Sequence, residues 1–154
     1  MFEIRPFESK DAAVVWALHN RALNAVGAHA GDGPWDDDLH DIERTYLDTG
    51  SEFLVATIDD KVVGMGALVP HSDGTGEIKR MRVEPDQQGQ GIGKALLKHL
   101  EAAAAKRGIT RLFLDTTEQQ TVARHLYESN DYVEEGRHQH GKFLVIKYGK
   151  GLSS

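Results

Sequence analysis

The chain has 154 residues, the size of one domain with a single apolar core, and it has no cysteine, which excludes disulfides, thiolate metal sites and a cysteine nucleophile. A formal net charge of -6 argues against broad binding to nucleic acids or to anionic membranes. Because the sequence shows no apolar run of membrane-spanning length and no charged-then-apolar leader, we expect a cytoplasmic protein. We also expect one domain over residues 1–150 and a disordered tail over residues 151–154.

The N-terminal half has the patterns of a strand, two helices and a β-hairpin. Apolar spacing predicts a strand over residues 2–5, followed by a helix that Ser9 or Asp11 caps and that ends near Gly27. A loop then runs to Trp35, and a second helix passes through Leu39 and Tyr46 and ends at Gly50. Two strands follow, over residues 52–58 and 61–69. Asp59 and Asp60 join the two strands, and such a pair is typical of a tight hairpin turn.

The C-terminal half alternates strands and helices. Its pattern predicts a turn over residues 72–76, a strand over 76–85 and a helix from Gly91 to Lys106. A buried strand over 111–115 and a helix from Thr117 through Tyr127 follow. Two closing strands are expected over 131–136 and 142–148, and the chain should fray from Gly149 onward. No internal repeat or low-complexity segment interrupts this order. The fold class is therefore α/β.

The strand over 76–85 contains an irregularity. Ile78 and Met81 are three residues apart, whereas Met81 and Val83 keep the two-residue period of a strand. A β-bulge near Lys79 and Arg80 would bring all three apolar side chains to one face, and it would leave backbone groups without ladder partners. Alternatively, Ile78 faces the other layer of a sheet that is covered on both sides.

Three glycines stand between this strand and the long helix, in the segment Gln88-Gly89-Gln90-Gly91-Ile92-Gly93. The start of a helix leaves backbone N–H groups unpaired, and glycine lets an anion approach them without a Cβ in the way. The segment therefore predicts a loop that binds a pyrophosphate.

Two common phosphate motifs do not fit this loop. A Walker loop would need glycine at Gln88 and Ser or Thr at Ala95. A G-x-G-x-x-G fingerprint would need glycine at Lys94 or at Leu96, depending on where it starts.

The pattern that fits is Q/R-x-x-G-x-G/A, and with it the chain resembles the GNAT acetyltransferase superfamily, whose members bind the pyrophosphate of acyl-coenzyme A with this motif. The preceding strand, Ala123, the run Leu126-Tyr127-Glu128 and Tyr132 also stand at the family's spacing. The resemblance is clear from about Phe53 to Tyr148.

The resemblance implies a GNAT acyl-CoA N-acyltransferase fold in three layers: a mixed, mostly antiparallel sheet of six to seven strands, flanked by about four helices and split between the fourth and fifth strands. In this family the pantetheine arm of acetyl-CoA lies in that split. The residues implied for binding the coenzyme are Met81, Arg82, Val83, Gln88, Gly89, Gln90, Gly91, Ile92, Gly93, Lys94, Gln120 and Tyr127. No metal is implied.

Acetyl transfer to an amine requires a neutral amine and a stabilised leaving thiolate, and the resemblance implies one residue for each task. Glu77 matches the position where some members carry the general base, although it could instead be a strand-edge glutamate paired with a cation. Tyr127 matches the tyrosine that points at the thioester sulfur. By spacing alone it is a core residue on the same stripe as Val122 and Leu126.

Three further features have ordinary structural interpretations. Gln120 stands where the family commonly has asparagine, and it could also reach back to Thr117 in a capping box. His138 and His140 share one strand face, but without a third ligand they favour a solvated loop over a metal site. Asp131 replaces a glycine that is usual in the family, and aspartate tolerates a left-handed turn.

Charge is distributed unevenly around the predicted site. Five basic residues near the glycine loop could provide a positive field for the anionic coenzyme: Lys79, Arg80, Arg82, Lys94 and Lys98. Four acidic residues lie in the segment that should border the acceptor: Asp32, Asp36, Asp37 and Asp38. They predict a cationic or neutral amine, unless they serve only the dipole of a helix start.

The sequence therefore predicts N-acetylation of a small primary amine by acetyl-CoA, through direct attack in a ternary complex. The partners expected are acetyl-CoA and that amine, with no nucleic acid and no membrane; homodimerisation stays open. The alternatives are acetylation of a protein or peptide N-terminus, and a non-catalytic acyl-CoA sensor.

Overall fold

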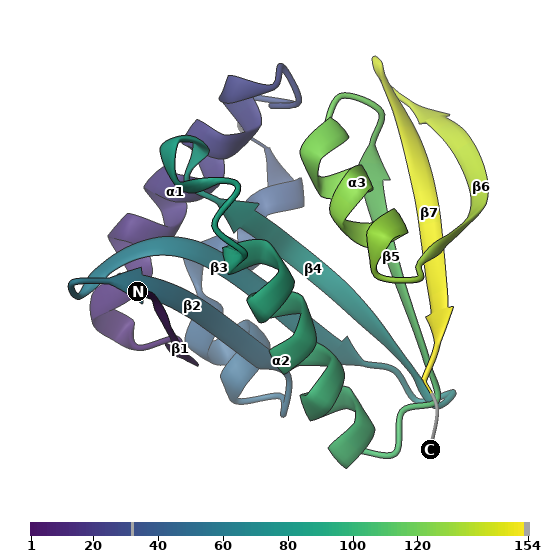
Figure 1. The fold of residues 1–154 in the computed structure, drawn as a ribbon, viewed down its shortest axis with the longest axis horizontal. Coiled ribbons are helices and arrows are strands. Elements are labelled where there is room, and N and C mark those ends of the chain that lie inside the picture. Colours follow the sequence, from purple (N-terminus) through teal and green to yellow (C-terminus); the bar gives the residue numbers. More distant parts are fainter. Residues whose placement is uncertain (32, 153–154) are drawn as a thin grey trace.

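The computed structural model describes residues 1–31 and 33–152, and its centre is a seven-stranded sheet in the order β1-β2-β3-β4-β5-β7-β6 (Figure 1). The strands are β1 (Glu3–Pro6), β2 (Glu52–Ile58), β3 (Lys61–Pro70), β4 (Thr75–Val83), β5 (Arg111–Thr117), β6 (Val133–His140) and β7 (Phe143–Gly151). All neighbouring strands are antiparallel except β4 and β5, which are parallel. The mixed, mostly antiparallel sheet predicted from the sequence is confirmed.

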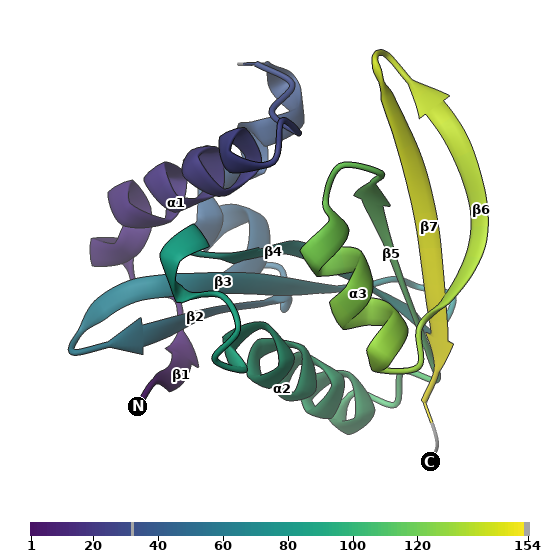
Figure 2. The same ribbon diagram turned by 45° about the horizontal axis from the view of Figure 1, so that its top comes forward.

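Helices cover both faces of this sheet. The α-helices of the described chain are α1 (Ala12–Ala25), α2 (Ile92–Lys106) and α3 (Thr121–Ser129). Figure 2 shows α1 on one side of the sheet and α2 with α3 on the other. None of the described helices has the length and apolar character needed to cross a membrane.

Two apolar clusters separate these three layers, because strands in the first half of the sheet bury side chains on both faces. In β2, Phe53 and Val55 pack in the cluster under α1, whereas Leu54 and Ala56 pack in the cluster under α2 and α3. At about 25 cal/mol per Å² of buried apolar surface, these two clusters are the main favourable contribution to folding.

The predicted bulge in β4 is confirmed. Met65 of β3 pairs with Arg82 and Ala67 pairs with Lys79, so two residues of β4 face one residue of β3 between them. Arg80 adopts a left-handed backbone with φ 60°. Ile78 and Met81 both lie in the cluster under α2, so the alternative that Ile78 faces the other layer is wrong.

The predicted split between β4 and β5 is also present. The two strands pair only over Thr75–Glu77 of β4 and Arg111–Phe113 of β5. Figure 1 shows them close together at one end and diverging toward the other. Beyond Glu77, the bulged half of β4 therefore has no partner strand on this side.

Three expectations about the elements are wrong. The second predicted helix is a 3-10 segment, η2 (Pro34–His40), followed by a single π-helical turn, η3 (Glu43–Leu47), because Asp41 between them leaves the helical region, with φ -152° and ψ 64°. The helix expected from Thr117 begins at Thr121, since strand pairing of Thr117 with Val145 extends β5 by two residues.

The third concerns the chain end. Gly149–Gly151 pairs with Phe113–Arg111 instead of fraying, and the N–H of Leu152 donates to the carbonyl of Thr110 at 2.8 Å. Sheet pairing thus fixes a segment that sequence composition alone predicted to be loose. Residues 153 and 154 of the expected tail lie outside the described residues.

Candidate functional site

Two cavities meet where β4 and β5 diverge. The loop-side cavity has a volume of about 260 Å³ and borders the glycine loop, α3 and the end of α1. The strand-side cavity has a volume of about 200 Å³ and is bordered by β4 and β5. Four residues line both of them: Met81, Arg82, Gln120 and Tyr127. The two cavities are therefore adjacent at these four residues.

The loop-side cavity gathers the predicted coenzyme residues, with one exception. Gln90 does not line it, and its side-chain amide donates instead to Gln87 at 2.6 Å. Gln88, Gly89 and Gly91 line the cavity directly. The other predicted coenzyme residues that line it are Met81, Arg82, Val83, Ile92, Gly93, Lys94, Gln120 and Tyr127.

The glycine loop suits an anion in its backbone conformation and in the space around it. Gly89 and Gly91 have φ values of 86° and 84°, which favour glycine, and a Cβ on either would meet no described atom within 4 Å. Gly93 is different, because a Cβ there would lie 3.1 Å from Leu126. The last glycine of the motif thus lets the start of α2 pack closely against α3.

The first turn of α2 offers unpaired donors to this cavity. Gly91 is the N-cap residue and provides no side-chain cap, and the N–H of Ala95 donates to the carbonyl of Gly91 at 3.0 Å. The N–H groups that precede Ala95 in the turn have no carbonyl four residues back within the helix. Together with the helix dipole they fit a diphosphate group, so the loop as folded suits coenzyme A.

The strand-side cavity contains the predicted base and a second carboxylate. Glu77 lies in β4 at the last residue paired with β5, and Asp115 lies two residues past that pairing on β5. The imidazole Nε2 of His71 is 3.2 Å from Glu77, and the His71 ring packs against Phe113 at an angle of 34° with centroids 5.4 Å apart. The contact with His71 gives Glu77 a partner on the surface and leaves the cavity side of its carboxylate accessible.

Tyr127 occupies the junction between the cavities. Its side chain is 4% exposed and packs in the core cluster, while no described side chain forms a hydrogen bond with its hydroxyl. Burial raises the pKa of Tyr127 to about 12, so the phenol is protonated at neutral pH. The packing role and the chemical role predicted for this residue are thus compatible.

Arg82 is a cation at the same junction without a carboxylate partner among residues 1–31 and 33–152. It donates to the Met81 carbonyl at 2.8 Å and approaches Gln120 Oε1 at 3.5 Å, while its Nε has no partner. Burial, followed by the charge of Arg80, lowers the pKa of Arg82 to about 10. The junction therefore has a positive potential, which disfavours the charged form of an amine placed there.

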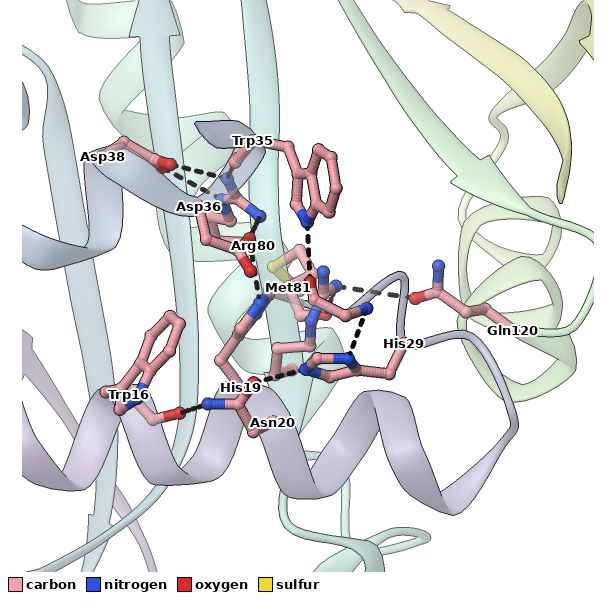
Figure 3. A network of polar contacts seen from close by, with 12 residues as sticks. Trp16, His19, Asn20, His29, Trp35, Asp36, Asp38, Arg80, Met81 and Gln120 are labelled. Atoms are coloured by element: carbon pink, nitrogen blue, oxygen red, sulfur yellow. Dashed lines mark hydrogen bonds and ion pairs between the residues drawn. The ribbon is translucent and has the colours of Figure 1, made fainter. Parts of the chain in front are cut away.

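Arg80 leaves the bulge in the other direction and holds the acidic segment (Figure 3). Its guanidinium donates to Asp38 at 3.0 and 2.6 Å, to Asp36 at 3.2 Å and to the Trp35 carbonyl at 2.6 Å. Tyr46 donates a hydrogen bond to the same Asp38 carboxylate. These contacts fasten η2 onto the bulge of β4.

Two members of the acidic segment have a different partner from the one predicted. Asp36 and Asp38 are engaged by Arg80 and line neither cavity. Asp36 and Asp37 lie in the first turn of η2, where the helix dipole favours acidic residues, and none of the described side chains caps the start of η2. Asp37 is exposed, and Asp32 lies outside the described residues. Asp36 and Asp38 are therefore neutralised by Arg80, and an acceptor role for Asp37 stays a prediction.

The predicted positive field around the loop is also smaller than expected. Arg80 is paired with Asp36 and Asp38, and Lys98 pairs with Glu101 at 3.2 Å. Of the five basic residues, Arg82 and Lys94 line the loop-side cavity. Lys79 lines the strand-side cavity instead.

His19 lies beneath this network in α1. Its side chain is fully buried, its Nε2 is 3.1 Å from Asp36, and neither ring nitrogen has a well-aligned hydrogen bond (Figure 3). Burial is the main cause that lowers the pKa of His19 to about 4. The residue is therefore a neutral part of the packing between α1 and η2 at neutral pH.

Residues beyond the sequence prediction also line the site. Ala22 and Val26 bring the end of α1 to the loop-side cavity, and Asp115 and Thr116 bring β5 to the strand-side cavity. The period of β5 places Asp115 on the face away from Leu112 and Leu114, but its place in the same cavity as Glu77 depends on the parallel pairing of two distant strands. His138 and His140 are exposed on β6, and no group of three metal-binding side chains occurs in the described part of the chain.

Comparison with known proteins agrees with this geometry. The model of the Acetyltransferase (GNAT) family matches residues 15–132. An acetyltransferase of Yersinia pestis (strain Pestoides F) is 32% identical over 115 residues, covering 73% of this chain and 79% of that protein. Human N-acetyltransferase 8B is 36% identical over 106 residues, covering 65% of this chain and 47% of that protein. The chain thus spans about half the length of this human relative.

Solved structures show the same fold. A GNAT-family acetyltransferase from Staphylococcus aureus Mu50 superposes with a TM-score of 0.91 at 20% identity, covering 99% of this chain and 100% of that chain. The PaiA N-acetyltransferase from Thermoplasma acidophilum, solved in complex with coenzyme A, has a TM-score of 0.78 at 19% identity, covering 96% of this chain and 98% of that chain.

Proposed function

The chain belongs to the Acetyltransferase (GNAT) family, and we propose that it transfers an acetyl group from acetyl-CoA to the primary amine of a small molecule. The observation that carries this proposal is the junction of the two cavities at Met81, Arg82, Gln120 and Tyr127. The loop-side cavity suits the coenzyme, and the strand-side cavity suits the acceptor.

The dimensions of the strand-side cavity support a small acceptor. Its volume of about 200 Å³ lies below the range of roughly 300 to 1,000 Å³ that is usual for ligand pockets. Its lining is mainly polar and charged, from Glu77, Lys79, Arg82 and Asp115. A small polar amine fits such a site better than an apolar one.

Acetyl-CoA supplies the acetyl group as a thioester and leaves as the free thiol. The amine must lose a proton before it attacks, because an amine with a pKa near 10.4 is almost fully protonated at neutral pH. Glu77 and Asp115 can accept that proton, and the positive charge of Arg82 at the junction favours the neutral amine. His71, in contact with Glu77, connects this carboxylate to the surface.

Tyr127 provides a proton donor on the coenzyme side of the junction. Its hydroxyl is protonated at neutral pH and lies free of other side chains in the described structure, so it can donate to the departing sulfur. Direct attack in a ternary complex follows from the two meeting cavities, and the chain has no cysteine that could carry the acetyl group between them.

The test is a turnover screen combined with a binding measurement. Thiol release from acetyl-CoA is followed with a panel of small amines and of peptides with free N-termini, and mass spectrometry identifies the acetylated products. Initial rates at varied concentrations of both substrates should give intersecting lines, and the intact protein should carry no acetyl group. Isothermal calorimetry measures acetyl-CoA binding independently.

The outcomes separate the three functions predicted from the sequence. Amine-dependent thiol release with small acceptors supports the proposal. Release with peptides alone would replace it by N-terminal acetylation of proteins. Coenzyme binding with no release for any amine would leave an acyl-CoA sensor.

A further inference from the structure

The strand-side cavity contains charges of both signs. Glu77 and Asp115 provide two carboxylates, whereas Lys79, Arg80 and Arg82 provide three cations. Arg80 is compensated outside the cavity by Asp36 and Asp38. The remaining charges are two negative and two positive groups, which together favour neither a polycation nor a polyanion.

Lys79 and Arg82 have no carboxylate within salt-bridge distance among the described residues, and both are half-buried. The charge of Lys79 acts on Asp38, but the two oxygens of that carboxylate are held by Arg80 and Tyr46. A partly desolvated cation without a partner is unfavourable, so an anionic group bound beside Lys79 would be stabilised.

A buried hydroxyl in the same cavity also lacks a partner. Thr116 is 5% exposed, lines the cavity, and its Oγ1 has no hydrogen-bond partner in the described structure. A buried hydroxyl left without a partner destabilises the folded protein. This orphaned polar atom indicates that the cavity receives a polar ligand.

We propose that the acceptor is a small amino acid, a molecule that carries a carboxylate as well as the primary amine, and that Lys79 binds this carboxylate. The inference rests on the proposed acetyltransferase function and specifies its substrate class. The ammonium group lies toward Glu77 and Asp115, which accept its proton, and the carboxylate lies toward Lys79. A diamine would place its second cation beside Lys79 and Arg82, and a dicarboxylate would place its second anion beside Glu77 and Asp115.

The test compares each standard protein amino acid with its own carboxamide as acceptor, at fixed saturating acetyl-CoA. For each enzyme, kcat/KM for the acid is divided by kcat/KM for the amide. The quantity compared is this ratio in the wild type divided by the same ratio in Lys79→Met, because the acid and the amide differ in the pKa of their amine. The pKa difference cancels in this double ratio. We expect it to be at least about 10, the loss for one hydrogen bond to a charged group.

Two matched variants accompany this measurement. Lys79→Arg keeps the charge and should restore most of the preference for the acid. Lys61→Met removes an exposed lysine of the β2–β3 hairpin, outside both cavities, and should leave the ratio unchanged. Melting temperatures of all variants exclude a folding defect as the cause.

The results distinguish the two levels of the proposal. A double ratio near 1, with acids and amides both acetylated, would overturn the amino-acid acceptor and leave the acetyltransferase function intact. If neither acids nor amides are acetylated while other amines of the panel give thiol release, the amino-acid acceptor is overturned alone. If no amine or peptide gives thiol release while calorimetry shows acetyl-CoA binding, the acetyltransferase function itself fails. A double ratio of about 10 or more, restored by Lys79→Arg, supports the inference.

Discussion

Arg80 of the β4 bulge and Asp38 of η2 form a paired contact, in which the guanidinium Nε and Nη2 donate to the two carboxylate oxygens at 3.0 and 2.6 Å. Both side chains are largely buried, with 13% and 14% of their surfaces exposed. Planar two-point pairing of this kind is specific to arginine. It fixes η2 against β4, whose residues line both cavities.

Removing Asp38 should therefore be costly. Asp38→Ala leaves a buried guanidinium without its main partner, and we expect the free energy of unfolding in urea to fall by about 3 kcal/mol. Asp37→Ala is the matched control, because Asp37 is exposed and its loss should change stability by less than about 0.5 kcal/mol. Equal effects of the two substitutions would show that the Arg80 contact does not stabilise the fold.

Coenzyme affinity should depend on Gly91. In Gly91→Asp, a side chain and a negative charge enter the space in front of the unpaired N–H groups of α2, so we expect calorimetry to detect no acetyl-CoA binding. Gly74→Asp adds the same charge at a comparable φ of 87° in the β3–β4 turn, where it should not alter affinity. A folded Gly91→Asp variant with wild-type affinity would refute the pyrophosphate loop.

The hydroxyl of Tyr127 should affect turnover rather than stability. Tyr127→Phe retains the ring and removes no hydrogen bond to another described side chain, so we expect kcat to fall at least about tenfold while the melting temperature and acetyl-CoA affinity stay the same.

Tyr132→Phe provides the opposite pattern. The Tyr132 hydroxyl donates to Glu101 at 2.8 Å away from both cavities, so its loss should cost about 1 kcal/mol of stability with no change in kcat. If Tyr127→Phe behaves like Tyr132→Phe, the role of Tyr127 is confined to packing.

Glu77 should be visible in the pH dependence of the reaction. Glu77→Gln preserves the shape and removes the proton acceptor, so the acidic limb of kcat/KM should move or vanish, with a rate loss of about 100-fold or more. Glu43→Gln, on the exposed surface of η3, serves as the control. A profile that runs parallel to the wild type with a small uniform decrease would assign deprotonation to Asp115 or water.

His19 should make stability depend on pH. Its pKa is lowered to about 4 in the folded protein, whereas a histidine in an unfolded chain titrates near 6.5, so the unfolded state binds the proton more readily. The contribution of neutral His19 to the free energy of unfolding is fully present above a pH of about 6.5. It is lost as the pH decreases toward 4, which lowers the free energy of unfolding by up to roughly 3 kcal/mol. Urea unfolding across this range measures the effect.

The control for this prediction removes the titrating group. His19→Gln should flatten the dependence between pH 4 and 6.5, whereas His99→Gln, at an exposed position of α2, should retain it. An unchanged slope in His19→Gln would assign the acid sensitivity to other groups.

Local patterns were sufficient to predict much of this molecule. The glycine loop follows from residues adjacent in sequence, because a helix start and small residues together define an anion site. The bulge follows from the spacing of Ile78, Met81 and Val83, since a shift of one residue moves side chains to the other face of a strand. The left-handed backbone of Asp131, with φ 73°, likewise follows from its residue type.

Other features depend on contacts between distant segments. Thr117 and Gly149–Gly151 are in strands because sheet partners supply their hydrogen bonds, which overrides the local signals for a helix start and a loose end. The role of Asp36 and Asp38 was mispredicted because their partner, Arg80, is more than 40 residues away in sequence.

The sequence by itself determined the α/β class, the order of the strands along the chain and the loop that suits a pyrophosphate, since each depends on periods and turns within a few residues. Only the tertiary structure decided which charges line the strand-side cavity. A charged side chain is neutralised or left available according to its neighbours in space. Lys79 and Arg80 are adjacent cations in the sequence, but the fold pairs Arg80 with two carboxylates, whereas Lys79 lines the cavity without a salt bridge to a described carboxylate.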